Sequence, residues 1–194
     1  MNSNPAVAGG VVYFGSRNSV QANTLYALYA NNGQAPPGWP IVSAANYPLD
    51  QVLAPAVSNG AVYAGGAMYP GSLSQFLQGV EAFDASNQAV LWFAQLCTPA
   101  DCNPLGAGPP AVADGSLFIG TTSGPFVLSS WNGTSTSFLP DLESTGVCTS
   151  APAVANGEMY IGCFDSNLRM FDTASQQLAW QYTTGAAVES SPLS

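Results

Sequence analysis

The sequence predicts an all-β fold, a β-propeller made of four-stranded antiparallel blades, and three features carry this prediction. A short motif with a two-residue turn at its centre occurs four times within the 194 residues. More strand-like segments follow each copy, and repeats of about 40–50 residues are typical of propellers. Only 7% of the residues are charged, so Ser, Thr, Asn, Gln and Gly must supply the polar surface, and most of these are weak helix formers.

The repeated motif is a predicted β-hairpin with the pattern P-A-V-[AS]-[GND]-G-x-[VLM]-[YF]-x-G. Its copies are residues 5–15, 55–65, 110–120 and 152–162. The central Asn-Gly, Asp-Gly or Gly-Gly pair tolerates the positive φ angles of a type I′ turn. Apolar residues on both sides of the turn supply the paired strands, and the leading proline stands where no ladder donor is lost.

Two more predicted strands follow each hairpin, so each unit has the content of a propeller blade. In the second and fourth units an aspartate precedes a tryptophan by eight residues. These pairs are Asp84 with Trp92 and Asp172 with Trp180. The first unit reaches Trp39 after two extra residues, and in the third unit Phe138 stands where a tryptophan is expected.

The chain therefore divides into four expected blades and the start of a fifth. The blades cover about 4–50, 51–106, 107–148 and 149–189, and a further strand begins at 190–194. Both ends of the chain carry the first strand of the repeat unit. We therefore expect the chain to be part of a larger propeller. The alternative is that the chain ends at 194, in which case its terminal blades are expected to pair with another copy.

The hairpin followed by the aspartate-to-tryptophan stretch resembles the pyrroloquinoline-quinone-type propeller repeat, over nearly the whole chain. That repeat occurs in quinoprotein alcohol dehydrogenases and in the non-enzymatic propeller lipoprotein of the bacterial outer-membrane assembly machine. The resemblance implies that the tryptophan docks one blade on the next. Trp92 and Trp180 match the docking position, and Trp39 is displaced from it.

The long loops are predicted to lie on one rim. In a four-stranded meander, the loops between the second and third strands and the connections between blades fall at the same end, and such loops carry binding. The candidate rim residues are Arg17, Met68, Tyr69, Phe76, Leu77, Asp101, Asp141, Glu143 and Asp165. The four carboxylates are expected to be solvated, with a shared calcium ion as the alternative. The apolar residues between 66 and 79 are expected to cover their own blade edge or to contact a partner.

Four cysteines favour two disulfides and an oxidising compartment, either extracellular or periplasmic. Cys148 and Cys163 flank the fourth hairpin two positions out of register, within reach of each other. Cys97 and Cys102 bracket a short loop, which predicts a local bridge. The alternative is that the cysteines are small buried apolar residues.

The composition of the chain excludes several classes of partner and of site. The net charge is -9, and the two cations are Arg17 and Arg169. So few cations cannot neutralise a row of phosphates or an anionic membrane surface. No apolar run reaches the roughly 18 residues of a membrane span. The absence of histidine excludes Ser-His-Asp triads and histidine-containing zinc sites.

The expected function is that of a non-catalytic, extracytoplasmic scaffold that binds a protein or glycan partner through the long-loop rim. We assign no catalytic, cofactor-binding or metal-binding residue. Enzymes of the resembling family hold a tricarboxylate quinone with basic side chains, and a chain of net charge -9 suits such a ligand poorly. A fragment of a quinone-dependent dehydrogenase and a structural module of an extracellular assembly are the alternatives.

Overall fold

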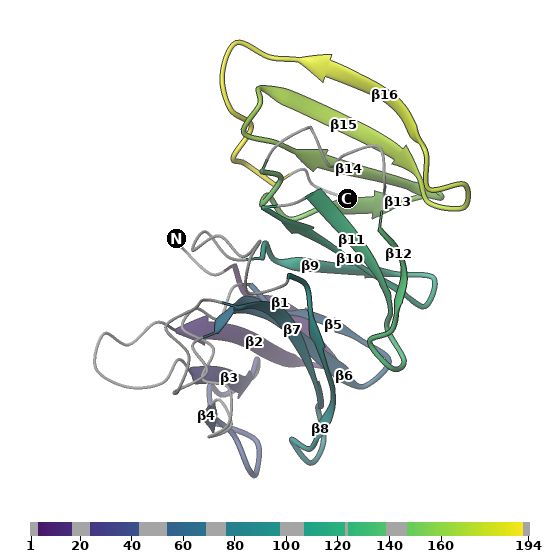
Figure 1. The fold of residues 1–194 in the computed structure, drawn as a ribbon. Coiled ribbons are helices and arrows are strands. Elements are labelled where there is room, and N and C mark those ends of the chain that lie inside the picture. The colour runs from purple at the N-terminus through teal and green to yellow at the C-terminus, as the bar shows by residue number, and fades with distance from the viewer. Residues whose placement is uncertain are drawn as a thin grey trace. The chain divides into compact units, whose positions relative to one another are not determined.

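The computed structural model describes residues 4–16, 24–42, 54–68, 77–97, 107–122, 124–138 and 147–191. Within these ranges the chain forms sixteen β-strands and no helix (Figure 1). The strands make four separate sheets of four strands each. The predicted all-β fold is confirmed.

Each sheet is an antiparallel meander in which neighbouring strands follow one another along the chain. The first contains β1 (Ala6–Ala8), β2 (Val11–Ser16), β3 (Thr24–Tyr29) and β4 (Ile41–Val42). The second contains β5 (Ala56–Ser58), β6 (Ala61–Met68), β7 (Leu77–Asp84) and β8 (Val90–Gln95). The third contains β9 (Pro110–Ala113), β10 (Ser116–Thr121), β11 (Gly124–Ser129) and β12 (Ser135–Phe138). The fourth contains β13 (Ala153–Ala155), β14 (Glu158–Gly162), β15 (Asn167–Asp172) and β16 (Leu178–Thr183). Four antiparallel strands in sequence are the content of a propeller blade.

The motif hairpins have the predicted tight turns. Asn156 and Gly157 have φ angles of 53° and 79°, and Asn59 and Gly60 have φ angles of 50° and 75°. Positive φ at both central residues is the requirement of a type I′ turn.

A carboxylate fixes the turn between the last two strands of the second and fourth blades. Asp84 Oδ1 accepts hydrogen bonds from the Ser86 amide at 2.8 Å and the Ser86 hydroxyl at 2.5 Å. Asp172 Oδ1 accepts the same two bonds from Ser175, both at 2.7 Å. These serine hydrogen bonds lower the pKa of both aspartates. The aspartate of the repeat therefore positions the turn that leads to the tryptophan strand.

The final glycine of the motif is a point of close backbone approach in the third and fourth blades. A Cβ atom on Gly120 would clash with the carbonyl oxygen of Cys148, in the segment that enters the fourth blade. A Cβ atom on Gly162 would lie 2.6 Å from the carbonyl oxygen of Val188. Only glycine fits beneath the crossing chain at both positions.

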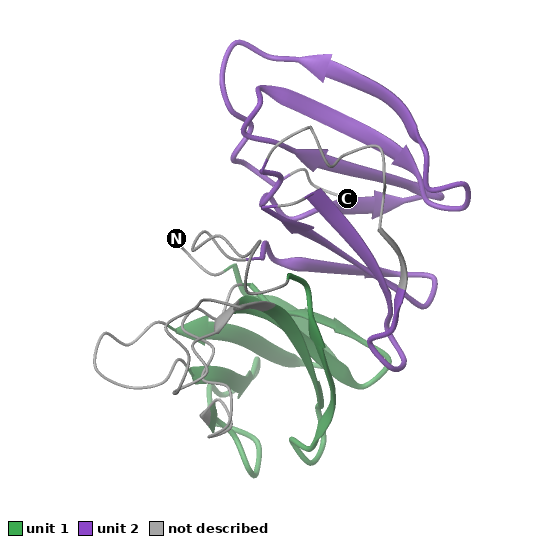
Figure 2. Ribbon diagram, in the orientation of Figure 1, with its two compact units in different colours: residues 1–106 green, residues 107–194 purple. Residues whose placement is uncertain are grey.

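The blades form two compact units, each with its own core. One unit is Met1–Gly106 and the other is Ala107–Ser194 (Figure 2). In the first unit, buried residues of the first two blades share one apolar cluster that includes Tyr13, Val62 and Phe83. In the second unit, Phe118 and Val127 of the third blade pack with fourth-blade residues such as Met159.

Two local expectations are corrected. Met68 and Leu77 do not lie within a long loop, because the ladder between β6 and β7 continues to the Met68–Leu77 pair. Phe138 does not occupy the tryptophan position of the third blade, since it pairs with Phe126. The register places Ser137 opposite Val127, as Trp92 lies opposite Ala82 in the second blade.

Candidate functional site

The meander order puts the predicted rim where β2, β6, β10 and β14 end and where chain passes from one blade to the next. Much of this rim lies outside the described residues. The predicted site residues outside them are Arg17, Tyr69, Phe76, Asp101, Cys102, Asp141 and Glu143. The part that the structure describes best is the rim of the fourth blade, around Asp165.

An ion pair lies at this rim. Arg169 is 2% exposed, and both of its terminal nitrogens bond the carboxylate of Asp165, one of them at 3.1 Å. The Asn167 amide donates to the same carboxylate at 3.2 Å. Partial burial alone would raise the pKa of Asp165, but the hydrogen bonds and the charge of Arg169 outweigh it, and the pKa is lowered. Asp165 therefore serves as the counter-ion of a buried arginine.

The Cys148–Cys163 disulfide lies directly beside this ion pair. The two sulfurs are bonded, as the sequence predicted, and both cysteines are fully buried. An Arg169 terminal nitrogen lies 3.9 Å from the Cys148 sulfur. Cys97 is also disulfide-bonded, while its predicted partner, Cys102, lies outside the described residues.

Backbone hydrogen bonds hold four chain segments together at the disulfide. The Cys148 amide donates to Thr121 at the end of β10, at 3.1 Å. The Phe164 amide donates to Val147 at 2.8 Å, and the Val188 amide donates to Cys163 at 3.0 Å. The disulfide, the ion pair and these bonds together fix the described rim of the fourth blade.

Removing this disulfide is expected to destabilise the chain. The double variant Cys148→Ala with Cys163→Ala should lose about 2–3 kcal/mol of unfolding free energy, because the bond closes a loop between residues 15 apart. Urea unfolding followed by circular dichroism measures the loss. Under reducing conditions the parent chain and the variant should unfold alike, and a difference that persisted there would contradict this assignment to the bond.

A second buried charge lies in the first unit. Glu81 in β7 is 8% exposed, and its strand partners are Ala64 and Phe93. Burial in these apolar surroundings raises the pKa of Glu81 to about 7. Arg169 pairs with Ile161 in β14, as Glu81 pairs with Ala64 in β6. Glu81 and Arg169 are the buried charged residues of the described chain, and they occupy equivalent positions in the second and fourth blades.

Neither buried charge was singled out as a site from the sequence. The sequence did contain a signal for the burial of these two charges, since residues two apart in a strand share a face. Glu81 lies two residues before the buried Phe83, and Arg169 lies two residues before the buried Phe171. This alternation indicates that both charges point toward a core.

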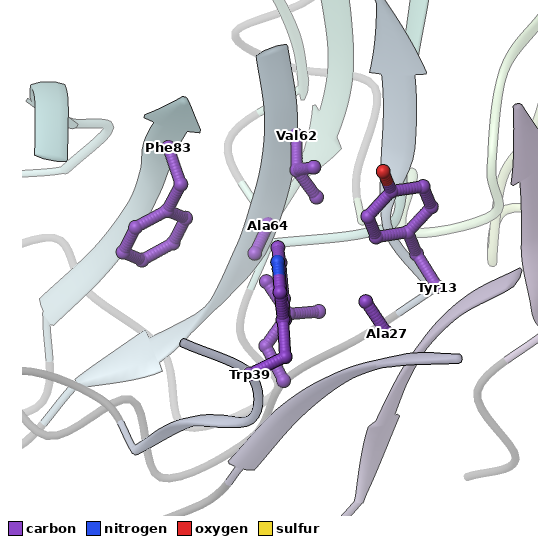
Figure 3. Packing of buried hydrophobic residues seen from close by; sticks show 7 residues of the cluster. Tyr13, Ala27, Trp39, Val62, Ala64 and Phe83 are labelled. Atoms are coloured by element: carbon purple, nitrogen blue, oxygen red, sulfur yellow. The ribbon is translucent and has the colours of Figure 1, made fainter. Parts of the chain in front are cut away.

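Trp39 joins the first blade to the second. It is 7% exposed, and its ring lies edge-on to Tyr13 of its own blade with centroids 5.5 Å apart. Its indole Nε1–H donates to the carbonyl oxygen of Ala85 in the second blade, at 3.4 Å. Figure 3 shows Trp39 among side chains of both sheets, with Tyr13 and Ala27 on one side and Phe83 on the other.

The same tyrosine–tryptophan pair recurs in the second and fourth blades. Trp92 lies 5.8 Å from Tyr63, and Trp180 lies 5.9 Å from Tyr160, between ring centroids. Trp92 is 9% exposed, whereas Trp180 is 41% exposed. Within the described chain the Trp180 ring is therefore open to solvent, unlike the rings of Trp39 and Trp92.

The described residues contain no group of three or more His, Cys, Asp or Glu side chains that could hold a metal ion. Of the four carboxylates considered for calcium, only Asp165 belongs to this part of the chain. No helix long and apolar enough to cross a membrane occurs there either.

Comparison with known proteins supports the propeller repeat that the sequence predicts. Residues 78–194 match the family described as outer membrane protein assembly factor BamB. Among solved structures, BamB from Moraxella catarrhalis is 17% identical with a TM-score of 0.66, over 94% of this chain and 52% of that one. Quinohemoprotein alcohol dehydrogenase ADHIIG from Pseudomonas putida HK5 is 16% identical with a TM-score of 0.65, over 97% and 35% of the two chains.

A third neighbour is the WD40 β-propeller domain of Doa1, 11% identical with a TM-score of 0.61, over 92% of this chain and 53% of that one. The chain thus spans about half or less of the length of each of these three structures. A search of curated proteins found no match. At these identities the likenesses show the fold, that of β-propeller blades.

Proposed function

Because the chain belongs to the pyrroloquinoline-quinone-type propeller-repeat family described as outer membrane protein assembly factor BamB, we propose that it is a non-catalytic extracytoplasmic scaffold. It binds a protein partner through the rim formed by its long loops. The family description, an assembly factor, favours a protein over a glycan as the partner.

The observation that carries this proposal is the fixed rim of the fourth blade. There a disulfide and a buried ion pair hold the loop that contains Phe164, which is 42% exposed. A loop fixed before binding loses less conformational entropy when a partner docks on it. Exposed side chains on a rigid scaffold are the usual binding elements of propeller-like folds.

Disulfide bonding supports the extracytoplasmic part of the proposal. Cys97, Cys148 and Cys163 are all bonded, and the described residues contain no free cysteine. Disulfides persist in oxidising compartments and are rare in the cytosol. The periplasm is such a compartment, and it is also where a factor for outer-membrane assembly would act.

Site-specific photo-cross-linking tests the proposal, with two exposed aromatic residues at opposite ends of the blades. Phe164 lies in the β14–β15 turn on the rim, and Trp131 is 88% exposed in the β11–β12 turn at the other end. With benzoylphenylalanine in place of Phe164, we expect one discrete protein adduct in cells of the organism that makes the chain. The same probe in place of Trp131 is the matched control and should give none.

Three results would contradict the proposal. The first is an adduct at position 131 equal to that at 164, or none at either position. The second is an adduct at 164 that survives complete proteolysis as a glycan. The third is alcohol-dependent dye reduction by the purified chain after addition of pyrroloquinoline quinone and Ca²⁺, which would indicate a dehydrogenase. The Cys148→Ala, Cys163→Ala variant should weaken the adduct at 164, because it loosens the rim.

A further inference from the structure

Each unit docks a blade on the following blade in the same way. In the first unit, Tyr13 and Ala27 of the first blade pack with Val62 and Phe83 of the second, around Trp39 (Figure 3). The counterparts of the first four residues share one cluster in the second unit: Phe118, Val127, Met159 and Phe171. We call the sheet face that carries the motif aromatic residue the outgoing face of a blade. The opposite face carries the residue before it, because neighbouring strand residues point to opposite sides, and is the incoming face.

The outgoing face of the fourth blade is exposed. Strand register places five large side chains on it: Tyr160, Leu168, Met170, Trp180 and Tyr182. All five are at least partly exposed, with Trp180 at 41% and Tyr182 at 66%. The corresponding residues of the second blade are all buried: Tyr63, Val80, Ala82, Trp92 and Ala94. An exposed apolar face whose counterpart is buried indicates an interaction surface.

The incoming face of the first blade is exposed as well. Val12 pairs with Leu28 on this face, and Phe14 pairs with Tyr26, their rings stacked with centroids 5.2 Å apart. Each of these four side chains is partly exposed. Their counterparts in the second and fourth blades are at most 8% exposed: Val62, Ala64, Glu81, Phe83, Met159, Ile161, Arg169 and Phe171. The first blade therefore presents a second apolar face to solvent.

The first blade also repeats the hydrogen-bond acceptor that Trp39 uses. The Trp39 indole N–H donates to the Ala85 carbonyl at 3.4 Å, and the Ala85 amide donates to Gly60 at 2.8 Å. In the first blade the Ala30 amide donates to Gly10, also at 2.8 Å, and Ala30 is exposed. Because the glycines of the two hairpins hold both alanines alike, the Ala30 carbonyl is the counterpart of the Ala85 carbonyl.

We propose that the outgoing face of the fourth blade binds the incoming face of the first blade of a second copy of this chain. Trp180 then packs on Val12 and Leu28 of the second copy, with its indole N–H directed to the Ala30 carbonyl. The contact repeats the docking of Trp39 within the first unit.

A second copy is the occupant that fits both exposed faces at once. Because one sequence carries both faces, two copies form the contact twice and close a ring from the four sheets of each. The chain spans 53% of the Doa1 propeller domain, so two copies supply about the length of one such propeller. Neither face includes the rim turn around Phe164, so the contact stands whether or not the rim binds a protein.

Sedimentation equilibrium of the purified chain tests the association. Because a closed pair makes the contact twice, we expect a dissociation constant of about 10 μM or lower. At about 100 μM chain, the measured mass should therefore be close to twice that of one copy. A mass that rises further with concentration also supports the contact, since a head-to-tail interface that does not close a ring forms open chains. The mass of a single copy would overturn the proposal.

One variant on each face tests the head-to-tail arrangement. Trp180→Asp places a charge on the outgoing face, and Leu28→Asp places one on the incoming face. Each variant alone should have the mass of a single copy, because it lacks one half of the contact. Trp131→Asp makes the same change at a turn position that is 88% exposed and should associate like the parent chain. Self-association of Trp180→Asp or of Leu28→Asp would show that like faces pair and would overturn the proposal.

A mixture of the two variants restores one complete contact. Leu28→Asp keeps Trp180, so it is isotope-labelled and titrated with unlabelled Trp180→Asp, which keeps Val12 and Leu28. The NMR signal of the Trp180 indole N–H should shift in a saturable manner, and that of Trp131 should stay in place. Equal shifts at both tryptophans, or no shift at Trp180, would contradict the contact.

Circular dichroism establishes whether each variant is folded. Where an aspartate variant is not, Trp180→Gln or Leu28→Gln takes its place, since glutamine removes the apolar side chain without adding a charge. These variants should give the same results in both experiments, and association of either one at the level of the parent chain would rule out the proposed contact.

Discussion

Trp39→Ala is expected to lower the free energy of unfolding by about 3–5 kcal/mol, the range for truncating a buried tryptophan. The ring is 7% exposed and packs with residues of two blades. The variant also removes the hydrogen bond to the Ala85 carbonyl, which would then lack its indole donor. Both losses act between the first and second blades.

Trp131→Ala is the matched control for this prediction. The same side chain is removed, but from a turn position that is 88% exposed. Its effect should stay within about 0.5 kcal/mol, as for surface substitutions in general. Urea unfolding followed by circular dichroism compares the two variants with the parent chain. Equal losses in the two would show that Trp39 does not dock the blades.

Glu81→Gln is expected to make the chain more stable at neutral and alkaline pH. Burial raises the pKa of Glu81 from 4.5 to about 7, so the folded chain binds a proton that the unfolded chain releases between these values. The contribution of Glu81 to stability is therefore fully present below pH 4.5 and is lost as the pH rises through 7. Between these two pH values the chain loses about 3 kcal/mol of unfolding free energy.

The variant should thus match the parent chain near pH 4 and exceed its unfolding free energy by about 3 kcal/mol near pH 8. Glutamine keeps the size of the side chain and removes its charge. Glu189→Gln makes the same chemical change at an exposed position and is the matched control, with an expected effect on unfolding free energy within about 0.5 kcal/mol. A pH-independent difference between Glu81→Gln and the parent would rule out titration of Glu81 as its cause.

The hairpins were predictable because their signals are local. The Asn-Gly pairs set positive φ angles by themselves, and the blade order follows from four meanders joined in sequence. The aspartates of the repeat stood out in the sequence, and the structure adds the reason for them, since they accept hydrogen bonds from the turn that follows.

The tryptophans show that a local sequence pattern does not predict how far a side chain is buried. Trp92 and Trp180 stand in the same pattern and contact equivalent tyrosines, yet one is 9% and the other 41% exposed. Trp39 departs from the spacing and is buried nonetheless. Exposure depends on what covers a ring, and the residues packed around Trp39 include Val62 and Phe83 of the second blade. A pattern within one repeat does not contain them.

The buried charges escaped prediction for a different reason. Glu81 and Arg169 were visible as charges, and alternation with Phe83 and Phe171 placed them inward, but charge alone favours an exposed position. Arg169 is tolerated in the core because Asp165 comes four residues earlier and reaches back to it across the β14–β15 turn. Such compensation is a property of the folded turn.

The glycine that ends each repeat motif bears on how this architecture can lengthen. At Gly120 and Gly162 the following segment of chain crosses directly over the bare backbone. The next segment of chain can cross here only because the motif residue has no side chain. Every duplicated copy of the motif carries this glycine. Gene duplication can therefore add units in tandem without inventing a new joint, while the connecting segments remain free to diverge in length.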